Sequence, residues 1–359
     1  MVLFIPSHGG NISQEARTLS CKVDEIIDAS ASIVPFKTPK SINKCLKDSI
    51  SKKVIRYYPD QEYQELKEAI SKRHEIEPSM VIPGNGAAEL ITWAARDAAK
   101  QGISSIISPG FSEYKRALQC WEGIYTDSQI PLSLKARNPQ PFPISPKTNV
   151  LWITNPHNPT GQLWERKSLE RLLSKYNLVV CDEAFLSLVP NGEQESLLHL
   201  VNNHDNLIVI RSLTKLFAIA GLRLGYAVSN KKRLHEWERI RDAWPINSLA
   251  SSVGIMLMND KKFYREWTDK IHLWVSEEGL WLHQNLEKIP GLISYRSSTN
   301  YQLIQGGKSL LPLRNKLAEN KILTRDCRSF SQLGENWLRI SLQTRKNNRR
   351  IIRAIKEFI

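Results

Sequence analysis

Short apolar runs recur between residues 81 and 229, and each one stops at a glycine or a polar side chain. Continuous apolar runs separated by helical segments are typical of parallel strands that are buried on both faces. The pattern therefore predicts an open α/β sheet, in which ligands bind along the edge where the strands end. The expected strands are the run before Gly84 and residues 104–108, 149–154, 178–182, 206–211 and 225–229.

One lysine lies just beyond such a run. Ser212 ends the strand over residues 206–211, and Lys215 follows three positions later. Partial burial at a strand end lowers a lysine pKa and prepares the amine to form a Schiff base. Ser212 and Arg223 are suited to bind a phosphate close to that amine. Together they suggest pyridoxal phosphate, although Ser-x-x-Lys alone fits a surface lysine before an amphipathic helix equally well.

Two glycines precede the expected helix over residues 87–100. Gly84 and Gly86 follow a short strand, and such a position leaves backbone N–H groups and the positive end of the helix dipole free to bind phosphate. The segment matches neither the Walker nor the dinucleotide-binding fingerprint. An ordinary glycine turn is the alternative.

Polar side chains follow two further strands. Asn158 lies in the Pro-bracketed turn over 155–161, and Asp182 comes directly after an apolar run. A carboxylate at that place is costly without a cationic partner, which favours a functional role. Beyond the strand at 104–108, Phe111 or Tyr114 is a candidate to stack on a flat cofactor ring, or either packs in the core.

The chain changes character beyond Arg241. Residues 244–287 are expected to be mostly helical, followed by four strands and two helices of a smaller α+β domain. Arg325 and Arg339 fall in two of these strands, where an arginine usually binds an anion and otherwise lies on an edge strand facing water. We expect an N-terminal arm (1–30) that joins the small domain as part of a substrate lid, a large cofactor-binding domain (31–255) and a small domain (256–359).

Composition argues against several other classes of protein. The five cysteines are scattered and form no C-x-x-C pair, which disfavours a disulfide framework or a metal site. No transmembrane run is present and residues 1–6 are too short for a signal peptide, so we expect a cytoplasmic protein without a membrane partner. The net charge of +14 raises nucleic acid as a partner, but the basic residues cluster only at 345–350. The other interpretation is that the positive charge steers small anions towards a site, and we expect no nucleic-acid partner.

Four segments together resemble the fold-type-I pyridoxal-phosphate enzymes of the class I/II aminotransferase superfamily. They are Gly84–Ala88, Asn155–Gly161, Asp182–Phe185 and Ser212-x-x-Lys215 with Arg223, and the resemblance spans about residues 25 to 345. It implies a large domain with a mostly parallel seven-stranded sheet, a smaller α+β domain, and a homodimer with its sites at the interface.

The resemblance also implies a role for each matching position. Lys215 would form the Schiff base and later move protons at the substrate α-carbon, and Asp182 would pair with the protonated pyridine nitrogen. Tyr58 would reach the phosphate of the cofactor in the neighbouring subunit. The implied cofactor-binding residues are Gly86, Ala87, Phe111, Asn158, Asp182, Ser212, Arg223 and Tyr58. Many relatives have tyrosine at Phe185, so one hydrogen bond to the ring 3-oxygen is absent here.

Two subgroups of the superfamily compete. Ser7-His-Gly-Gly-Asn11, Asp182–Phe185 and Ile322–Cys327 are similar to threonine-phosphate decarboxylases of cobalamin biosynthesis, lyases that convert O-phospho-L-threonine to (R)-1-aminopropan-2-yl phosphate. Histidinol-phosphate aminotransferases share the core but generally lack the opening motif. Ser32 and Val34 depart from the decarboxylase pattern, which usually has asparagines there.

The residues expected to bind substrate come from the two chain ends. Arg339, with Asn158, would orient the carboxylate, whereas His8, Gly9 and Arg325 would bind the substrate phosphate. Rotation of the substrate selects decarboxylation or transamination, because only the bond perpendicular to the ring breaks. A non-enzymatic regulator on the same fold is a remote alternative, disfavoured because only about 25 residues precede the fold.

Overall fold

The computed structural model describes residues 8–132 and 138–359. Residues 1–7, which include Ser7 of the opening motif, and residues 133–137 lie outside the described part.

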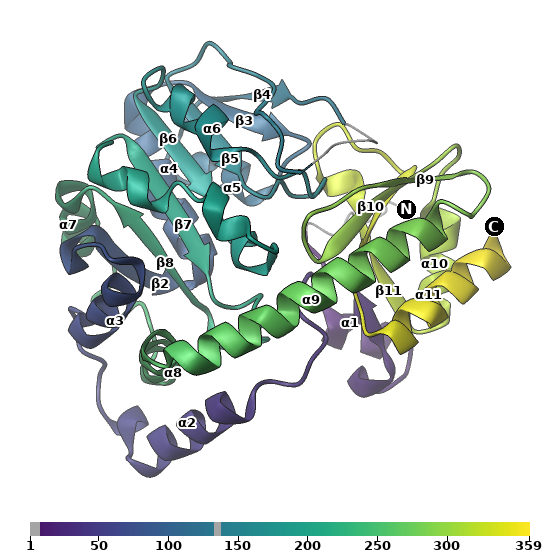
Figure 1. Ribbon diagram of the computed structural model, residues 1–359, viewed down its shortest axis with the longest axis horizontal. Helices are drawn as coiled ribbons and strands as arrows, with labels where there is room; N and C mark the ends of the chain where they lie inside the picture. Colours follow the sequence, from purple (N-terminus) through teal and green to yellow (C-terminus); the bar gives the residue numbers. More distant parts are fainter. Residues whose placement is uncertain (1–7, 133–137) are drawn as a thin grey trace.

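Two sheets organise the chain, and the long helix α9 runs from one to the other (Figure 1). The strands are β1 (Ile27–Ala29), β2 (Val81–Asn85), β3 (Ser104–Ser108), β4 (Tyr125–Gln129), β5 (Val150–Thr154), β6 (Leu178–Asp182), β7 (Leu207–Ser212), β8 (Leu224–Ser229), β9 (Leu292–Tyr295), β10 (Tyr301–Gly306), β11 (Ile322–Asp326) and β12 (Trp337–Ser341).

The larger sheet has seven strands in the order β2-β8-β7-β6-β5-β3-β4. Only β8 runs antiparallel to its neighbours, so the segment that enters β8 lies at the same edge as the ends of the other strands. This geometry brings Arg223, directly before β8, to the edge where β2, β6 and β7 end. The expectation of a mostly parallel seven-stranded sheet is confirmed.

Helices cover both faces of this sheet, which explains the apolar runs. Val180 and Ile208 belong to the cluster beneath α4, whereas Val179 and Val209 belong to the cluster on the opposite face. Every residue of β5 to β8 is buried. The helices are α1 (Ile12–Thr18), α2 (Lys40–Ser51), α3 (Gln64–His74), α4 (Gly86–Gln101), α5 (Glu113–Gln119), α6 (Arg166–Leu173), α7 (Lys231–Ile240), α8 (Ser248–Asn259), α9 (Lys261–Leu286), α10 (Leu311–Glu319) and α11 (Arg345–Phe358).

The sequence pattern did not predict β4. Its residues are mostly polar and partly exposed, and β4 is an edge strand that pairs only with β3. A strand with one free edge and a wet face lacks the apolar run that marks a buried strand.

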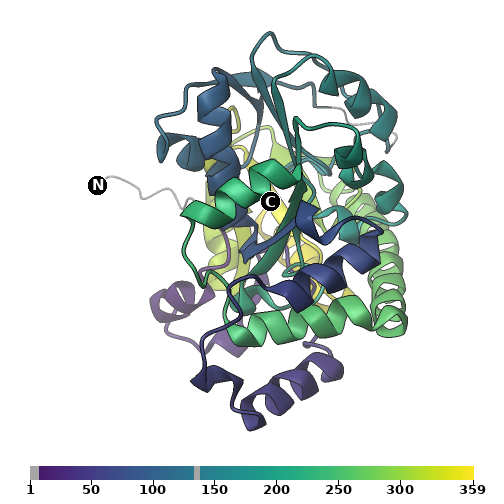
Figure 2. The same ribbon diagram turned by 90° about the vertical axis from the view of Figure 1, so that its left-hand side faces the viewer.

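The smaller sheet has five strands in the order β1-β11-β12-β10-β9. β1 comes from the N-terminal segment and pairs in parallel with β11, so the two ends of the chain share one sheet. Figures 1 and 2 show α2 beside α8 at one edge of the molecule, away from this sheet.

The domain boundaries at residues 30 and 255 stay a prediction. Within the described residues, no helix combines the length and apolar character needed to cross a bilayer.

Candidate active site

A cavity of about 340 Å³ lies where the strands of the larger sheet end and is closed by residues of the smaller sheet and the N-terminal arm. It brings together most of the residues singled out in the sequence. Those that line it are His8, Gly9, Ala87, Phe111, Asn158, Asp182, Ser212, Lys215, Arg223, Arg325 and Arg339. Gly86 is next to the cavity through its contact with Arg223, whereas Tyr58 lies elsewhere.

Lys215 extends from the segment directly after β7, is partly buried and lines the cavity. Burial, followed by the positive charges of Arg223 and Arg339, lowers the pKa of its amine to about 8, although Asp182 raises it. Its Nζ lies 5.8 Å from the centre of the Phe185 ring. A larger fraction of this amine is therefore unprotonated near neutral pH than in an exposed lysine, which suits a nucleophile.

Asp182 ends β6 in the interior of the protein. Its Oδ2 accepts a hydrogen bond of 2.7 Å from the Tyr114 hydroxyl, and its Oδ1 accepts one of 2.9 Å from the Ala184 N–H. Burial raises the pKa of Asp182, while these hydrogen bonds and the charge of Lys215 lower it. The carboxylate is thus held in a fixed orientation at the cavity wall, where it can accept a hydrogen bond from a protonated ring nitrogen.

The structure also distinguishes the roles of the two aromatic candidates, Phe111 and Tyr114. Tyr114 is buried in the core beside Trp152, with its ring 5.4 Å away, and does not line the cavity. Phe111 does line it, with its ring 5.7 Å from that of His8. Phe111 is therefore the side chain available to stack on a ligand, and Tyr114 acts through Asp182.

The start of α4 has features that suit an anion. Gly86 has a φ of +76°, and a Cβ built there would lie 2.6 Å from Nη2 of Arg223. Only glycine lets the guanidinium approach the backbone this closely. The Ser212 hydroxyl, which bonds to that of Thr214 over 2.8 Å, faces the same cavity. The donors and the positive end of the helix dipole suit a phosphate.

Two arginines lie side by side on the smaller sheet. Arg325 and Arg339 are directly opposite each other in the antiparallel pairing of β11 with β12. Arg339 is buried and donates from Nη1 to Oδ1 of Asn158 over 2.6 Å, while its buried Nε has no partner among the described residues. Burial and the neighbouring charge of Arg339 lower the pKa of Arg325 to about 10. Neither arginine faces bulk water, so the edge-strand alternative is wrong for both.

The N-terminal arm packs against the same site. Gly10 donates its N–H to Oγ of Ser30 over 3.0 Å, and a Cβ at Gly9 would lie 2.5 Å from the Ser30 carbonyl oxygen. His8 Nε2 lies 2.8 Å from a carboxylate oxygen of Glu113. The glycines therefore allow the close backbone contact that holds His8 at the cavity.

The sequence positions that depart from the decarboxylase pattern have structural roles. Ser32 is buried and bonds through Oγ to Oγ of Ser341 over 2.9 Å, and Val34 is part of the core. Phe185 packs edge-on against Tyr301, with ring centres 5.3 Å apart. Sequence reasoning missed Tyr301, which lies below the guanidinium of Arg339, because a buried aromatic residue in a strand carries no signal beyond that of core packing.

Tyr58 is 78% exposed and stacks on Trp244, with ring centres 4.4 Å apart. It does not contribute to the cavity of its own chain. Its expected contact with the cofactor of a neighbouring subunit stays a prediction.

Comparison with known proteins places these features in context. A family model for aminotransferases of class I and II matches residues 24–355. A threonine-phosphate decarboxylase of Salmonella typhimurium is 30% identical, over 100% of this chain and 98% of its own length. A histidinol-phosphate aminotransferase of Methanosphaera stadtmanae is 27% identical, over 94% of this chain and 91% of its own length. The fold is that of the histidinol-phosphate aminotransferase of Sinorhizobium meliloti solved with pyridoxal 5'-phosphate, with a TM-score of 0.81, 18% identity, and coverage of 100% of this chain and 98% of that one.

Proposed function

The chain belongs to the aminotransferase class I and II family, and we propose that it is a lyase that decarboxylates O-phospho-L-threonine to (R)-1-aminopropan-2-yl phosphate. The full-length similarity to a threonine-phosphate decarboxylase supports this choice within the family. A role in cobalamin biosynthesis follows from the same resemblance.

The cofactor is pyridoxal 5'-phosphate, and the cavity residues fit it. The close approach of Arg223 to Gly86, which a Cβ would block, provides a cradle for the cofactor phosphate together with Ala87 and Ser212. The buried carboxylate of Asp182 suits the pyridine nitrogen, and the amine of Lys215 suits the aldehyde. When bound, the cofactor withdraws electrons from a bond at the substrate α-carbon.

The paired arginines are the observation that carries the choice of substrate. O-Phospho-L-threonine has a carboxylate and a phosphate on adjacent parts of a short molecule, so it needs two cationic groups close together. Arg325 and Arg339 are directly opposite on neighbouring strands and line one cavity with Lys215. Their mutual repulsion in a buried setting would be relieved by a substrate that carries two anionic groups.

Each residue then has one task. Arg339 binds the carboxylate, with Asn158 fixing the plane of the guanidinium, and Arg325 and His8 bind the substrate phosphate. The bond between the carboxylate carbon and the α-carbon breaks, carbon dioxide leaves, and Nζ of Lys215 supplies a proton to the α-carbon. Gly9 and Gly10 of the N-terminal arm line the same cavity.

The experiment that tests this proposal is product analysis by mass spectrometry after the cofactor-loaded protein has been incubated with O-phospho-L-threonine. We expect aminopropan-2-yl phosphate to appear as substrate disappears. The competing function is histidinol-phosphate aminotransferase activity, which the similarity to the Methanosphaera stadtmanae enzyme favours. An unchanged phosphothreonine pool together with amino transfer from histidinol phosphate would select that function instead.

A homodimer and a cytoplasmic location are further parts of the proposal. Every cysteine in the described residues is free, which suits a reducing compartment. The exposed aromatic pair of Tyr58 and Trp244 supports a partner subunit at that face.

A further inference from the structure

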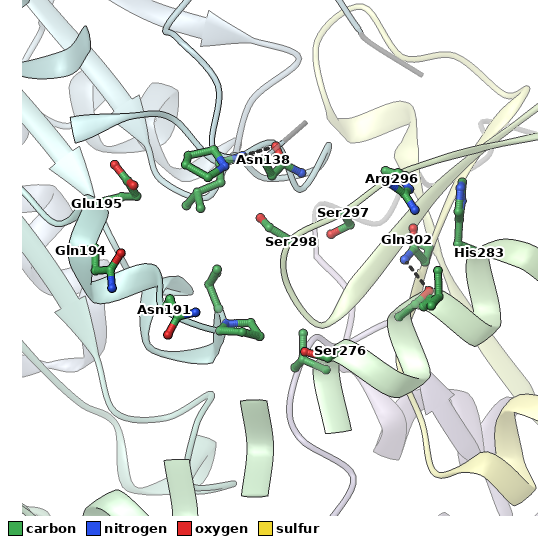
Figure 3. A pocket seen from close by; sticks show the side chains of 17 residues that line it. Asn138, Asn191, Gln194, Glu195, Ser276, His283, Arg296, Ser297, Ser298 and Gln302 are labelled. Atoms are coloured by element: carbon green, nitrogen blue, oxygen red, sulfur yellow. Dashed lines mark hydrogen bonds between the residues drawn. The ribbon is translucent and has the colours of Figure 1, made fainter. Parts of the chain in front are cut away.

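A second cavity, of about 710 Å³, lies between the two sheets and shares no lining residue with the first (Figure 3). One wall belongs to the larger sheet's side of the molecule and includes the segment Val189–Glu195. The other wall is formed by α9 and by the chain around β9 and β10. The cavity is therefore lined by segments that are far apart in sequence.

Two polar side chains on the second wall lie close to each other in the fold. Tyr295, the last residue of β9, is directly opposite Leu303 of β10. Arg296 directly follows Tyr295, and Gln302 directly precedes Leu303. Both line the cavity, and Figure 3 shows them next to each other.

Gln302 has an unused hydrogen-bond acceptor. The residue is 1% exposed, and its Nε2 donates to the carbonyl oxygen of Gly279 over 3.2 Å. Its buried Oε1 has no partner within the described ranges 8–132 and 138–359. A buried amide oxygen without a donor costs about 1–3 kcal/mol, so it favours a ligand that brings an N–H group.

The charges around the cavity select the kind of ligand. Arg296 is an exposed cation at the mouth. Burial, together with the charge of Arg296, lowers the pKa of His283, although Glu287 raises it. Glu195 lines the opposite wall, where its Oε2 accepts the N–H of Arg166 over 2.6 Å. An anionic group is thus favoured beside Arg296 and disfavoured near Glu195.

We infer that this cavity binds a small α-amino acid, with its carboxylate on Arg296, its ammonium on Oε1 of Gln302 and a neutral or basic side chain towards Glu195. An α-amino acid carries its anion and its donor two bonds apart, which matches a cation and an acceptor that lie next to each other in the cavity (Figure 3). The inference is independent of the reaction proposed for the first cavity.

Isothermal titration calorimetry tests it with L-proline, L-threonine and L-lysine as probes. The cofactor-loaded Arg339→Gln variant is the host, because that change weakens amino-acid binding at the first cavity. We expect at least one probe to bind once per chain with a Kd below about 1 mM. Adding Arg296→Gln to the same host should weaken that binding about 10- to 100-fold, the effect of losing one charge-assisted hydrogen bond.

Arg353→Gln is the matched control, since Arg353 is an exposed arginine on α11 outside the cavity, and it should leave binding unchanged. Absence of binding by all three probes up to about 10 mM overturns the inference. Equal affinity with and without Arg296 also overturns it. None of these readouts depends on decarboxylation.

Discussion

The Tyr114 hydroxyl donates a hydrogen bond to the Asp182 carboxylate over 2.7 Å, and both side chains are buried. This bond supports a charge that the interior would otherwise disfavour, because burial raises the pKa of Asp182. Tyr114 therefore holds in place the group that we assign to the pyridine nitrogen, without lining the cavity itself.

Tyr114→Phe should lower the free energy of unfolding by about 1.5–3 kcal/mol, because it removes a hydrogen bond to a buried ionised group. It should also weaken retention of the cofactor. Urea unfolding followed by tryptophan fluorescence measures the first effect, and dialysis followed by absorbance measures the second. Tyr176→Phe is the control, since the Tyr176 hydroxyl donates to the neutral carbonyl oxygen of Pro146 over 2.8 Å and its loss should cost about 1 kcal/mol. Equal costs for the two variants would contradict the role of Tyr114.

Lys215 should destabilise the cofactor-free protein. Its pKa falls from 10.5 to about 8 on folding, so between these values the unfolded chain binds more protons than the folded chain. The contribution of Lys215 to the free energy of unfolding therefore rises with pH from about 8 to 10.5, and its penalty is fully present below pH 8.

Lys215→Met should consequently raise the free energy of unfolding at pH 7, by about 3 kcal/mol, and remove that part of the pH slope. Urea titrations of the cofactor-free protein at pH 7 and pH 10 measure both effects. Lys262→Met, at a lysine whose side chain is 80% exposed, should change neither. A Lys215→Met protein no more stable than the parent would show that the amine is not desolvated.

Arg325→Gln should lower kcat/KM for O-phospho-L-threonine about 10- to 100-fold, through the loss of a charge-assisted contact with the substrate phosphate. The same change should alter any turnover of L-threonine, which lacks the phosphate, less than threefold. Arg328→Gln is the matched control, because that guanidinium pairs with Asp326 and does not line the cavity. A decrease in kcat/KM of equal size with both substrates would show that Arg325 does not bind the substrate phosphate.

Tyr58→Phe should weaken cofactor retention about 10-fold if the hydroxyl binds the phosphate of a neighbouring subunit, since one hydrogen bond to a charged group is lost. Tyr57→Phe, at the adjacent and similarly exposed tyrosine, should have no effect. Sedimentation must show a dimer for both proteins. A monomer that retains the cofactor as tightly as the parent would contradict the interface prediction.

Local signals in the sequence were sufficient to predict that several polar groups lie at one edge of a sheet. Asp182 ends the buried strand β6 and Lys215 follows the buried strand β7 by three positions, and parallel strands bring such positions to one edge. Arg223 reaches the same edge because β8, which it directly precedes, runs antiparallel to its neighbours. The structure confirms that these groups line one cavity.

The sequence did not predict contacts that depend on strand register or on distant packing. The pairing of Arg325 with Arg339, and the bond from Tyr114 to Asp182, each join segments whose relative placement is set by the whole fold. The predicted contact of Tyr58 depends on packing between subunits rather than on packing within one chain. Tyr301 was missed since its apolar surroundings give the pattern of an ordinary core residue.

The most direct test of the proposed function compares two reactions on one preparation of cofactor-loaded protein. Carbon dioxide released from carboxyl-labelled O-phospho-L-threonine is measured beside amino transfer from histidinol phosphate to 2-oxoglutarate. We predict one equivalent of carbon dioxide for each phosphothreonine consumed, and a kcat/KM for the transfer at least about 100-fold lower. Efficient amino transfer without release of carbon dioxide would contradict the assignment of a decarboxylase.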